Sequence, residues 1–245
     1  MRLDPLSQAP DADAAHRVAA VRARITAAAL AAGRDPADVT LVAVGKTRGA
    51  EALRAVADAG VMDFGENYLQ EALGKQVLLG GAALRWHFIG AIQSNKTRAL
   101  AEHFDWVHTV DREKIARRLA AHRPDDRPPL NLCLQVNIDR EPTKAGLDPD
   151  ALADVFAAIR DLPGLRIRGL MAIPAPRREP AAQRDAFARV AALRDALAEA
   201  WPDSPLDVLS MGMSDDLEAA IAAGATHVRI GTALFGPRAT REHTQ

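Results

Sequence analysis

The chain has 245 residues with a hydrophobic fraction of 48%, which is ordinary for a globular protein with a sizeable core. Its formal net charge of -1 at pH 7 excludes non-specific charge attraction to nucleic acid or anionic lipid as the basis of its function. The single cysteine, Cys133, cannot form an internal disulfide, so the sequence predicts a reducing compartment.

The amino-terminal stretch MRLDPLSQAPDADAA has no apolar core of the kind that a secretory signal peptide carries. Nowhere does the sequence approach the roughly 18 consecutive apolar residues that a membrane span needs. We therefore expect a cytoplasmic protein that binds neither nucleic acid nor membrane.

The first predicted element is a helix over residues 12–33, where apolar residues recur at helical spacing up to Gly33, a typical helix stop. From there, short apolar or β-branched runs alternate with amphipathic segments. The predicted strands cover residues 39–45, 61–64, 85–89, 104–109, 130–138, 165–173, 206–210 and 226–231. The predicted helices lie near residues 49–59, 66–79, 95–102, 112–121, 149–161, 180–200 and 214–223. Residues 237–245 are expected to form a frayed tail.

Strands that alternate with helices predict parallel βαβ units. Eight such strands in about 200 residues favour a closed (β/α)8 TIM barrel with an extra N-terminal helix. The alternative is a doubly wound open sheet, but the fingerprint G-x-G-x-x-G after its first strand is absent. The loops 122–129 and 174–180 are too short to link domains. The prediction is therefore a single domain over residues 1–245, with its core at about residues 12–236.

Lys46 ends the first predicted strand in the stretch LVAVGKT. A nucleotide-binding P-loop would need a glycine at Thr40, so that motif is excluded. By alternation Lys46 shares a face with Val42 and Val44, and a lysine facing a barrel interior is costly unless it is paired, neutral or covalently bonded. Burial lowers the pKa of a lysine, which suits a Schiff-base nucleophile. The structural alternative is a lysine whose amine reaches water at the rim of the barrel.

Small residues follow the last two predicted strands. Ser210 and Gly212 form a turn before a helix for which Ser214 is a plausible N-cap, and Gly231 and Thr232 follow the eighth strand. Exposed backbone N–H groups and hydroxyls in two adjacent turns can hold a phosphate, and barrels often bind phosphate after strands 7 and 8. The alternative is that both are ordinary strand-to-helix turns.

A Schiff-base lysine beside a phosphate site is what pyridoxal 5′-phosphate requires. Arg229 shares a strand face with Gly231, and if that face points inward its guanidinium could reach the pyridine nitrogen of such a cofactor. Arginine only donates hydrogen bonds, so the nitrogen would stay unprotonated and the ring would be a weak electron sink. The alternative is a surface or structural arginine.

Six stretches, in order and spacing, resemble the pyridoxal phosphate homeostasis protein family over about residues 12–236. They are VAVGKT, DFGENYLQE, WHFIGAIQSNK, VNIDREPTKAGL, GLMAIP and LSMGMSDDLEAAIAAGATHVRIGTALFG. The resemblance implies a barrel similar to the N-terminal domain of alanine racemase, without firmly established catalysis. It further implies a role in vitamin B6 and amino-acid homeostasis as a cofactor carrier or buffer. We expect a monomer whose partners are pyridoxal phosphate and the apo-enzymes that receive it.

Carried over position by position, the resemblance assigns the Schiff base to Lys46, the pyridine nitrogen to Arg229 and a place beside the ring to Asn67. The phosphate contacts it implies are Ser210, the Met211 backbone, Gly231 and Thr232. The chain departs from the usual family pattern at Gly45, where serine is common, and at Ala91, where proline is common. Gly45 could loosen the backbone that aims Lys46.

Two enzyme classes remain as alternatives. A pyridoxal-phosphate-dependent amino-acid racemase needs a second base opposite Lys46. The chain offers a single tyrosine, Tyr68, and His87 could be a base but is more typical of a core or rim position. A cofactor-free aldolase would use Lys46 and the phosphate site on a sugar phosphate, and would be colourless. A metal hydrolase is disfavoured because the histidines are scattered without H-E-x-x-H spacing.

Overall fold

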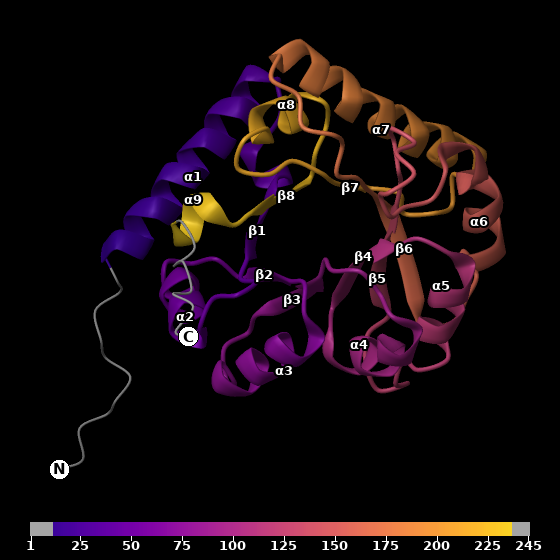
Figure 1. The fold of residues 1–245 in the computed structure, drawn as a ribbon, viewed down its shortest axis with the longest axis horizontal. Coiled ribbons are helices and arrows are strands. Elements are labelled where there is room, and N and C mark those ends of the chain that lie inside the picture. Colours follow the sequence, from indigo (N-terminus) through magenta and orange to yellow (C-terminus); the bar gives the residue numbers. More distant parts are fainter. Residues whose placement is uncertain (1–11, 237–245) are drawn as a thin grey trace, which may run out of the picture.

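The computed structural model describes residues 12–236 and shows eight parallel strands closed into a barrel in chain order (Figure 1). Closure comes from the pairing of the first strand with the last, in a register that places Val42 opposite Arg229. The strands are β1 (Thr40–Val44), β2 (Asp63–Glu66), β3 (Arg85–Phe88), β4 (Trp106–Val110), β5 (Leu130–Gln135), β6 (Leu165–Met171), β7 (Val208–Ser210) and β8 (His227–Ile230). The predicted (β/α)8 barrel is confirmed.

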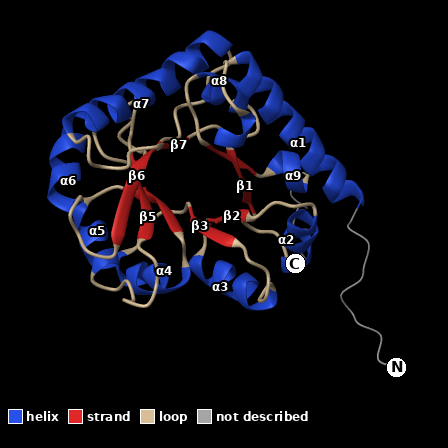
Figure 2. Cartoon of the chain, turned by 180° about the vertical axis from the view of Figure 1, so that it is seen from behind, coloured by secondary structure: helices blue, strands red, loops and turns tan. Residues whose placement is uncertain are grey.

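Helices form an outer ring around the strands (Figure 2). They are α1 (Ala12–Ala31), α2 (Ala50–Asp58), α3 (Leu69–Leu78), α4 (Thr97–His103), α5 (Glu113–Ala120), α6 (Leu152–Ile159), α7 (Pro180–Ala200), α8 (Leu217–Ala222) and α9 (Thr232–Phe235). Three short 3-10 helices interrupt the loops: η1 (Pro36–Asp38), η2 (Ser94–Lys96) and η3 (Pro149–Ala151). Within residues 12–236, none of these helices has the length and apolar character that crossing a membrane requires.

The extra N-terminal helix α1 covers the seam where the barrel closes. Its apolar residues recur every three or four positions, so Val18, Val21 and Ile25 are buried on one face. That face packs against α2, α8 and α9. Arg17 adds a hydrogen bond from Nε to the carbonyl oxygen of Leu234, at 2.6 Å. The first helix of the chain is thus fixed to the last.

Two regions of the core differ in chemistry. Between strands and helices lies a large apolar cluster that includes Phe64, Phe104 and Phe156, all fully buried. The inside of the barrel is unusually polar, because the fully buried His87 and His108 lie where bulky branched residues usually fill such barrels.

Cys133 lies in a small buried cluster with Trp106, Met171 and Val208. Burial raises the pKa of its thiol to about 12. The thiol therefore stays protonated and unreactive at neutral pH.

The second strand differs from its prediction. It was expected over residues 61–64 with a helix from residue 66, but β2 covers Asp63–Glu66 and α3 begins at Leu69. The predicted strand stops just before Gly65, because glycine is typical of a strand end. In the structure Gly65 lies within β2 and pairs with Val44 of β1 and His87 of β3. A side chain there would approach Val42 and Ile89 at 3.1 Å, so the strand needs a glycine at this crowded point.

Smaller corrections concern four other elements. The fifth and seventh strands are shorter than the predicted 130–138 and 206–210. Residues 232–235 form α9, which the sequence did not predict. The eighth predicted helix, 214–223, starts only at Leu217, and this frees the preceding loop to face the mouth of the barrel.

Candidate functional site

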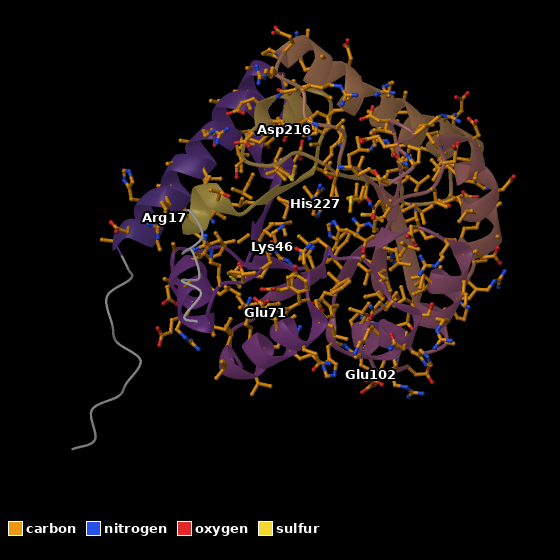
Figure 3. All side chains as sticks on the ribbon, viewed as in Figure 1. Arg17, Lys46, Glu71, Glu102, Asp216 and His227 are labelled. Atoms are coloured by element: carbon orange, nitrogen blue, oxygen red, sulfur yellow. The ribbon has the colours of Figure 1, made fainter. Side chains whose placement is uncertain are left out.

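A cavity of about 220 Å³ opens at the carboxyl ends of the strands. Its lining residues come from β1, β2, β3, β6, β7 and β8 or from the loops that follow them: Val44, Lys46, Asn67, Ile89, Ile173, Met213, Ser214, Asp215, Arg229, Gly231 and Thr232. Five of the seven predicted site residues meet here, namely Lys46, Asn67, Arg229, Gly231 and Thr232. Figure 3 shows Lys46 inside the ring of helices, toward the centre of the barrel. The volume is below the roughly 300–1,000 Å³ of typical drug-sized sites, so the cavity suits a small ligand.

Lys46 is held in place through its two neighbours in the chain. Lys75 donates from Nζ to the carbonyl oxygen of Gly45 at 2.8 Å. The amide N–H of Thr47 donates to Glu71 Oε1 at 2.6 Å, and Thr47 itself has a positive φ of 64°. The backbone on both sides of Lys46 is therefore fixed by α3, and we find no looseness of the kind that Gly45 suggested.

Lys75 and Glu71, which hold the backbone beside Lys46, belong to one ion cluster with the fully buried Glu66. Lys75 Nζ lies 2.7 Å from Glu66 Oε1 and 2.5 Å from Glu71 Oε1. A Cβ atom on Gly45 would come within 2.6 Å of Glu66 Oε1. The Glu66 carboxylate thus occupies the space that a side chain at Gly45 would need, which explains the glycine before Lys46.

Burial raises the pKa of Glu66 to about 7, although Lys75 opposes the shift, and its Oε2 has no hydrogen-bond partner within residues 12–236. The folded state keeps a proton that the unfolded state releases near the ordinary glutamate pKa of 4.5. The stability that this proton contributes is therefore fully present below pH 4.5 and is lost as the pH rises through 7.

We expect Glu66→Gln to flatten this dependence, because the amide cannot ionise. Between pH 5 and pH 7, the unfolding free energy of the variant should fall by about 2 kcal/mol less than that of the parent. Urea unfolding at several pH values measures this. Parallel curves for the two proteins would mean that Glu66 does not titrate in this range.

Arg229 reaches the cavity from a buried position. Its side chain is 4% exposed, and burial lowers its pKa only to about 10, so it stays charged at neutral pH. Nη1 donates to Ser210 Oγ at 2.8 Å and Nη2 donates to the carbonyl oxygen of Ala172 at 3.1 Å. No ion pair involves Arg229 within the described part of the chain. The charged guanidinium of Arg229 therefore borders the same cavity as Lys46 and still has N–H groups that can donate to a ligand.

The hydroxyls at this mouth come from Ser214 and Thr232. The N-cap of α8 is Asp216, so Ser214 is not the cap that the sequence suggested. Within residues 12–236, neither the Ser214 nor the Thr232 hydroxyl makes a hydrogen bond to the protein. Together with Gly231 they line one side of the cavity, and they are available to an anion.

Two of the residues predicted to contact a phosphate, Ser210 and Met211, are not among the residues that line the cavity. Ser210 is fully buried below the cavity, where its hydroxyl contacts His108 and Arg229. The Met211 amide N–H is already donated to the carbonyl oxygen of His227, at 3.1 Å, and its side chain is in the core. The chain reaches the mouth of the barrel only after the turn at Gly212, whose φ is 94°. Ser214, four residues after Ser210, lines the cavity.

The chain is similar in sequence to proteins of one known family. The family described as alanine racemase, N-terminal domain, matches residues 17–239. A pyridoxal phosphate homeostasis protein of Pseudomonas aeruginosa is 61% identical over 224 residues, covering 91% of this chain and 95% of the relative. The Escherichia coli protein of the same name is 51% identical over 229 residues, covering 92% and 97%.

This chain belongs to the pyridoxal phosphate homeostasis protein family. A solved structure of a relative, PipY of Synechococcus elongatus with pyridoxal phosphate bound, is 39% identical with a TM-score of 0.81, covering 91% of this chain and 100% of PipY. Alanine racemase of Corynebacterium glutamicum shares the fold, with a TM-score of 0.68 and 18% identity, and the match covers 95% of this chain and 64% of the racemase.

Sequence reasoning missed several members of the site. Ser214 and Asp215 lie in the stretch SMGMSDD, but Ser214 was predicted to be a helix N-cap and Ser210 to contact the phosphate. The cluster of Glu66, Glu71 and Lys75 was hidden because these residues were placed in one helix. The signal would have been a lysine nine positions after a glutamate at a strand end and four positions after a second glutamate.

Proposed function

We propose that this protein binds pyridoxal 5′-phosphate covalently through Lys46 and acts as a carrier or buffer of the cofactor, without strong catalysis of its own. One observation carries the proposal: Lys46 and Arg229 border the same small cavity as Ser214, Gly231 and Thr232. Family membership and the cofactor in PipY support it.

The residues present fit this cofactor group by group. Pyridoxal phosphate supplies an aldehyde for condensation with an amine, with loss of water, and a ring that can withdraw electrons. Lys46 is the sole lysine among the lining residues described and would supply that amine. Ser214, Thr232 and the turn at Gly231 would hold the phosphate, while Asn67 would lie beside the ring.

The chemistry of Arg229 favours storage over catalysis. A guanidinium is a donor at neutral pH, so it would leave the pyridine nitrogen without a proton and weaken the ring as an electron sink. The racemase alternative lacks its expected partners at the cavity, because Tyr68 lies in a neighbouring cavity and His87 is buried inside the barrel. Asp215 is the one acidic side chain among the lining residues described.

The test of the proposal is the absorbance of the purified protein, followed by borohydride reduction and peptide mass mapping. We expect a yellow band that disappears on reduction and a pyridoxyl mass on the peptide that contains Lys46. A protein that stays colourless with added pyridoxal phosphate would contradict the proposal and favour the cofactor-free aldolase.

Replacing Arg229 with glutamine should shift the absorbance maximum of the bound cofactor, because a neutral amide replaces the cation at the ring. It should also weaken binding by roughly tenfold, the effect of losing one charge-assisted hydrogen bond. Titration with pyridoxal phosphate under an absorbance readout measures both. An unchanged spectrum and affinity would mean that Arg229 does not contact the ring.

The carrier role implies a recipient. We propose that apo-enzymes take the cofactor from this protein and that it acts as a monomer. Loaded protein should restore activity to an apo-enzyme faster than free cofactor at the same concentration, and sedimentation should give the mass of one chain. Equal rates would mean that the protein buffers the cofactor and does not deliver it to apo-enzymes.

A further inference from the structure

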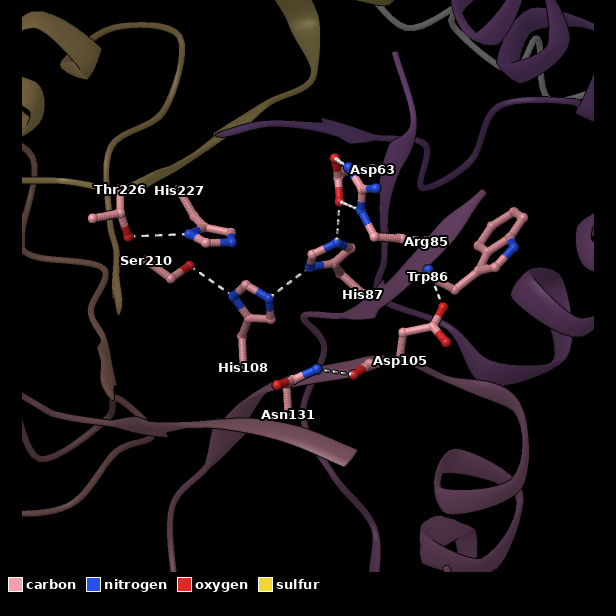
Figure 4. Close-up of polar contacts among 10 residues, drawn as sticks. All are labelled: Asp63, Arg85, Trp86, His87, Asp105, His108, Asn131, Ser210, Thr226 and His227. Carbon is pink, nitrogen blue, oxygen red and sulfur yellow. Dashed lines mark hydrogen bonds and ion pairs between the residues drawn. The ribbon is translucent and has the colours of Figure 1, made fainter. Parts of the chain in front are cut away.

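Six polar side chains form a continuous series of hydrogen bonds through the inside of the barrel, and Figure 4 shows it from Arg85 as far as Ser210. We call it the buried polar chain; its members in order are Arg85, Asp63, His87, His108, Ser210 and Arg229. The hydrogen bond from β4 to β7 joins strands that are not neighbours in the barrel, so it crosses the interior.

The buried polar chain runs from one end of the barrel to the other. At the amino-terminal end, Arg85 donates to both Asp63 oxygens at 2.6 Å, beside a separate cavity of about 430 Å³. Its other end is Arg229, at the cavity of Lys46. The inner links measure 3.0 Å from Asp63 Oδ1 to His87 Nε2 and 2.9 Å from His87 Nδ1 to His108 Nε2. His108 Nδ1 then lies 2.7 Å from Ser210 Oγ.

The charge states in the chain follow from the surroundings. Burial alone would raise the pKa of Asp63, but hydrogen bonds from His87 and Arg85 outweigh it and hold that pKa at about 2. Burial lowers the pKa of His87 and, more strongly, that of His108. At neutral pH the chain therefore holds one carboxylate and two neutral imidazoles, each with one proton to place.

Proton positions then follow one after another. A carboxylate only accepts hydrogen bonds, so His87 carries its proton on Nε2, and its Nδ1 is bare, that is, unprotonated. His108 must donate from Nε2 to that bare nitrogen, which leaves its own Nδ1 bare. The Ser210 hydroxyl donates to His108 Nδ1, and its oxygen accepts from Arg229 Nη1. Every donor in the chain points toward Asp63.

We propose that Asp63 is a positioning residue for the cofactor site at the opposite end of the barrel. It fixes the tautomers of His87 and His108 and directs the Ser210 hydroxyl hydrogen away from Arg229. The Ser210 oxygen is then an acceptor that holds the guanidinium in place at the cavity. The contact between Arg229 and the cofactor rests on the function proposed above. The order of protons along the buried polar chain does not.

The opposite order of protons is the physical alternative. His108 and Arg229 would then both donate to Ser210 Oγ, and the Ser210 hydrogen would be left without an acceptor in a fully buried position. An unpaired buried donor is costly, and neighbouring hydrogen bonds in a low-dielectric interior reinforce one another. The carboxylate of Asp63 is what selects between the two orders.

The first test uses the unliganded wild-type protein. Nitrogen-15 NMR of labelled histidines separates protonated from bare ring nitrogens. We expect His87 and His108 to carry their protons on Nε2, with bare Nδ1 atoms. A proton on Nδ1 of either ring would overturn the proposal, and this result does not depend on cofactor binding.

The second test is Asp63→Asn, of nearly the same shape. Its side-chain oxygen can still accept from Arg85, while its N–H₂ donates to His87 Nε2, so both histidines should move their protons to Nδ1. His227→Gln is the matched control, because His227 lies beside the chain but its Nδ1 contacts Thr226 Oγ1, at 3.1 Å. The control should leave the tautomers of His87 and His108 unchanged.

The same pair of variants tests the link to the site. Asp63→Asn should shift the absorbance of bound pyridoxal phosphate and lower its affinity roughly tenfold, whereas His227→Gln should change neither. Unchanged tautomers in Asp63→Asn, or changed tautomers with an unchanged spectrum and affinity, would overturn the positioning role. A wild-type protein that has the expected tautomers but binds no cofactor would contradict the proposed function alone.

Discussion

Replacing Lys46 with alanine is expected to abolish the reducible adduct with pyridoxal 5′-phosphate while the barrel stays folded. No other lysine lines the cavity within residues 12–236, so no second amine can take over. The Lys46 ammonium makes no hydrogen bond or ion pair in the described part of the chain. Its removal therefore takes away no contact on which the fold depends.

Mass mapping after borohydride treatment measures the loss, and circular dichroism and the midpoint of thermal unfolding check the fold. Lys114→Ala is the matched control, since Lys114 is exposed on α5 and far from the cavity lining. It should keep the full adduct. An adduct of wild-type yield in Lys46→Ala would show that the covalent site is elsewhere.

Replacing Lys75 with methionine is expected to produce the largest loss of stability. The change keeps much of the side-chain volume but leaves the fully buried Glu66 without its cation, and the carbonyl of Gly45 without its donor. Removing one partner of a buried ion pair typically costs about 3–5 kcal/mol. The loss should be greatest at pH 8, where Glu66 would otherwise be ionised, and smaller at pH 5.

The double variant Glu66→Gln with Lys75→Met isolates the pair. It removes the buried negative charge together with the cation, so it should regain much of the lost stability and show little dependence on pH over this range. Urea unfolding of the four proteins gives the coupling free energy. Equal losses in the single Lys75 variant and in the double variant would mean that the Glu66 charge is not the cause.

The barrel and most of its site could be predicted because both follow from local patterns. Eight apolar runs separated by amphipathic helices leave few other folds, and strand ends in parallel sheets meet at one edge. Lys46, Asn67, Arg229, Gly231 and Thr232 come together for that reason alone. Ser210 is not among the residues that line the cavity, because the chain reaches the mouth of the barrel only after the turn at Gly212.

The buried polar chain could not have been predicted from spacing. His87, His108 and Ser210 lie on three strands, and their contacts exist only because the closed barrel brings β4 opposite β7. Glu66 was misplaced for a related reason. Its neighbour Gly65 is typical of a strand end, and only the crowding by Val42 and Ile89 shows that the strand continues through it.

The seam between β1 and β8 has a consequence for how the protein is made. Lys46 follows the first strand and Arg229 lies on the last, so the ribosome releases one half of the site long before the other. Until β8 emerges, the barrel is open, and α9, which follows β8 and packs against α1, has not yet been made. The cavity that Lys46 and Arg229 share therefore exists only after β8 has been made and has paired with β1.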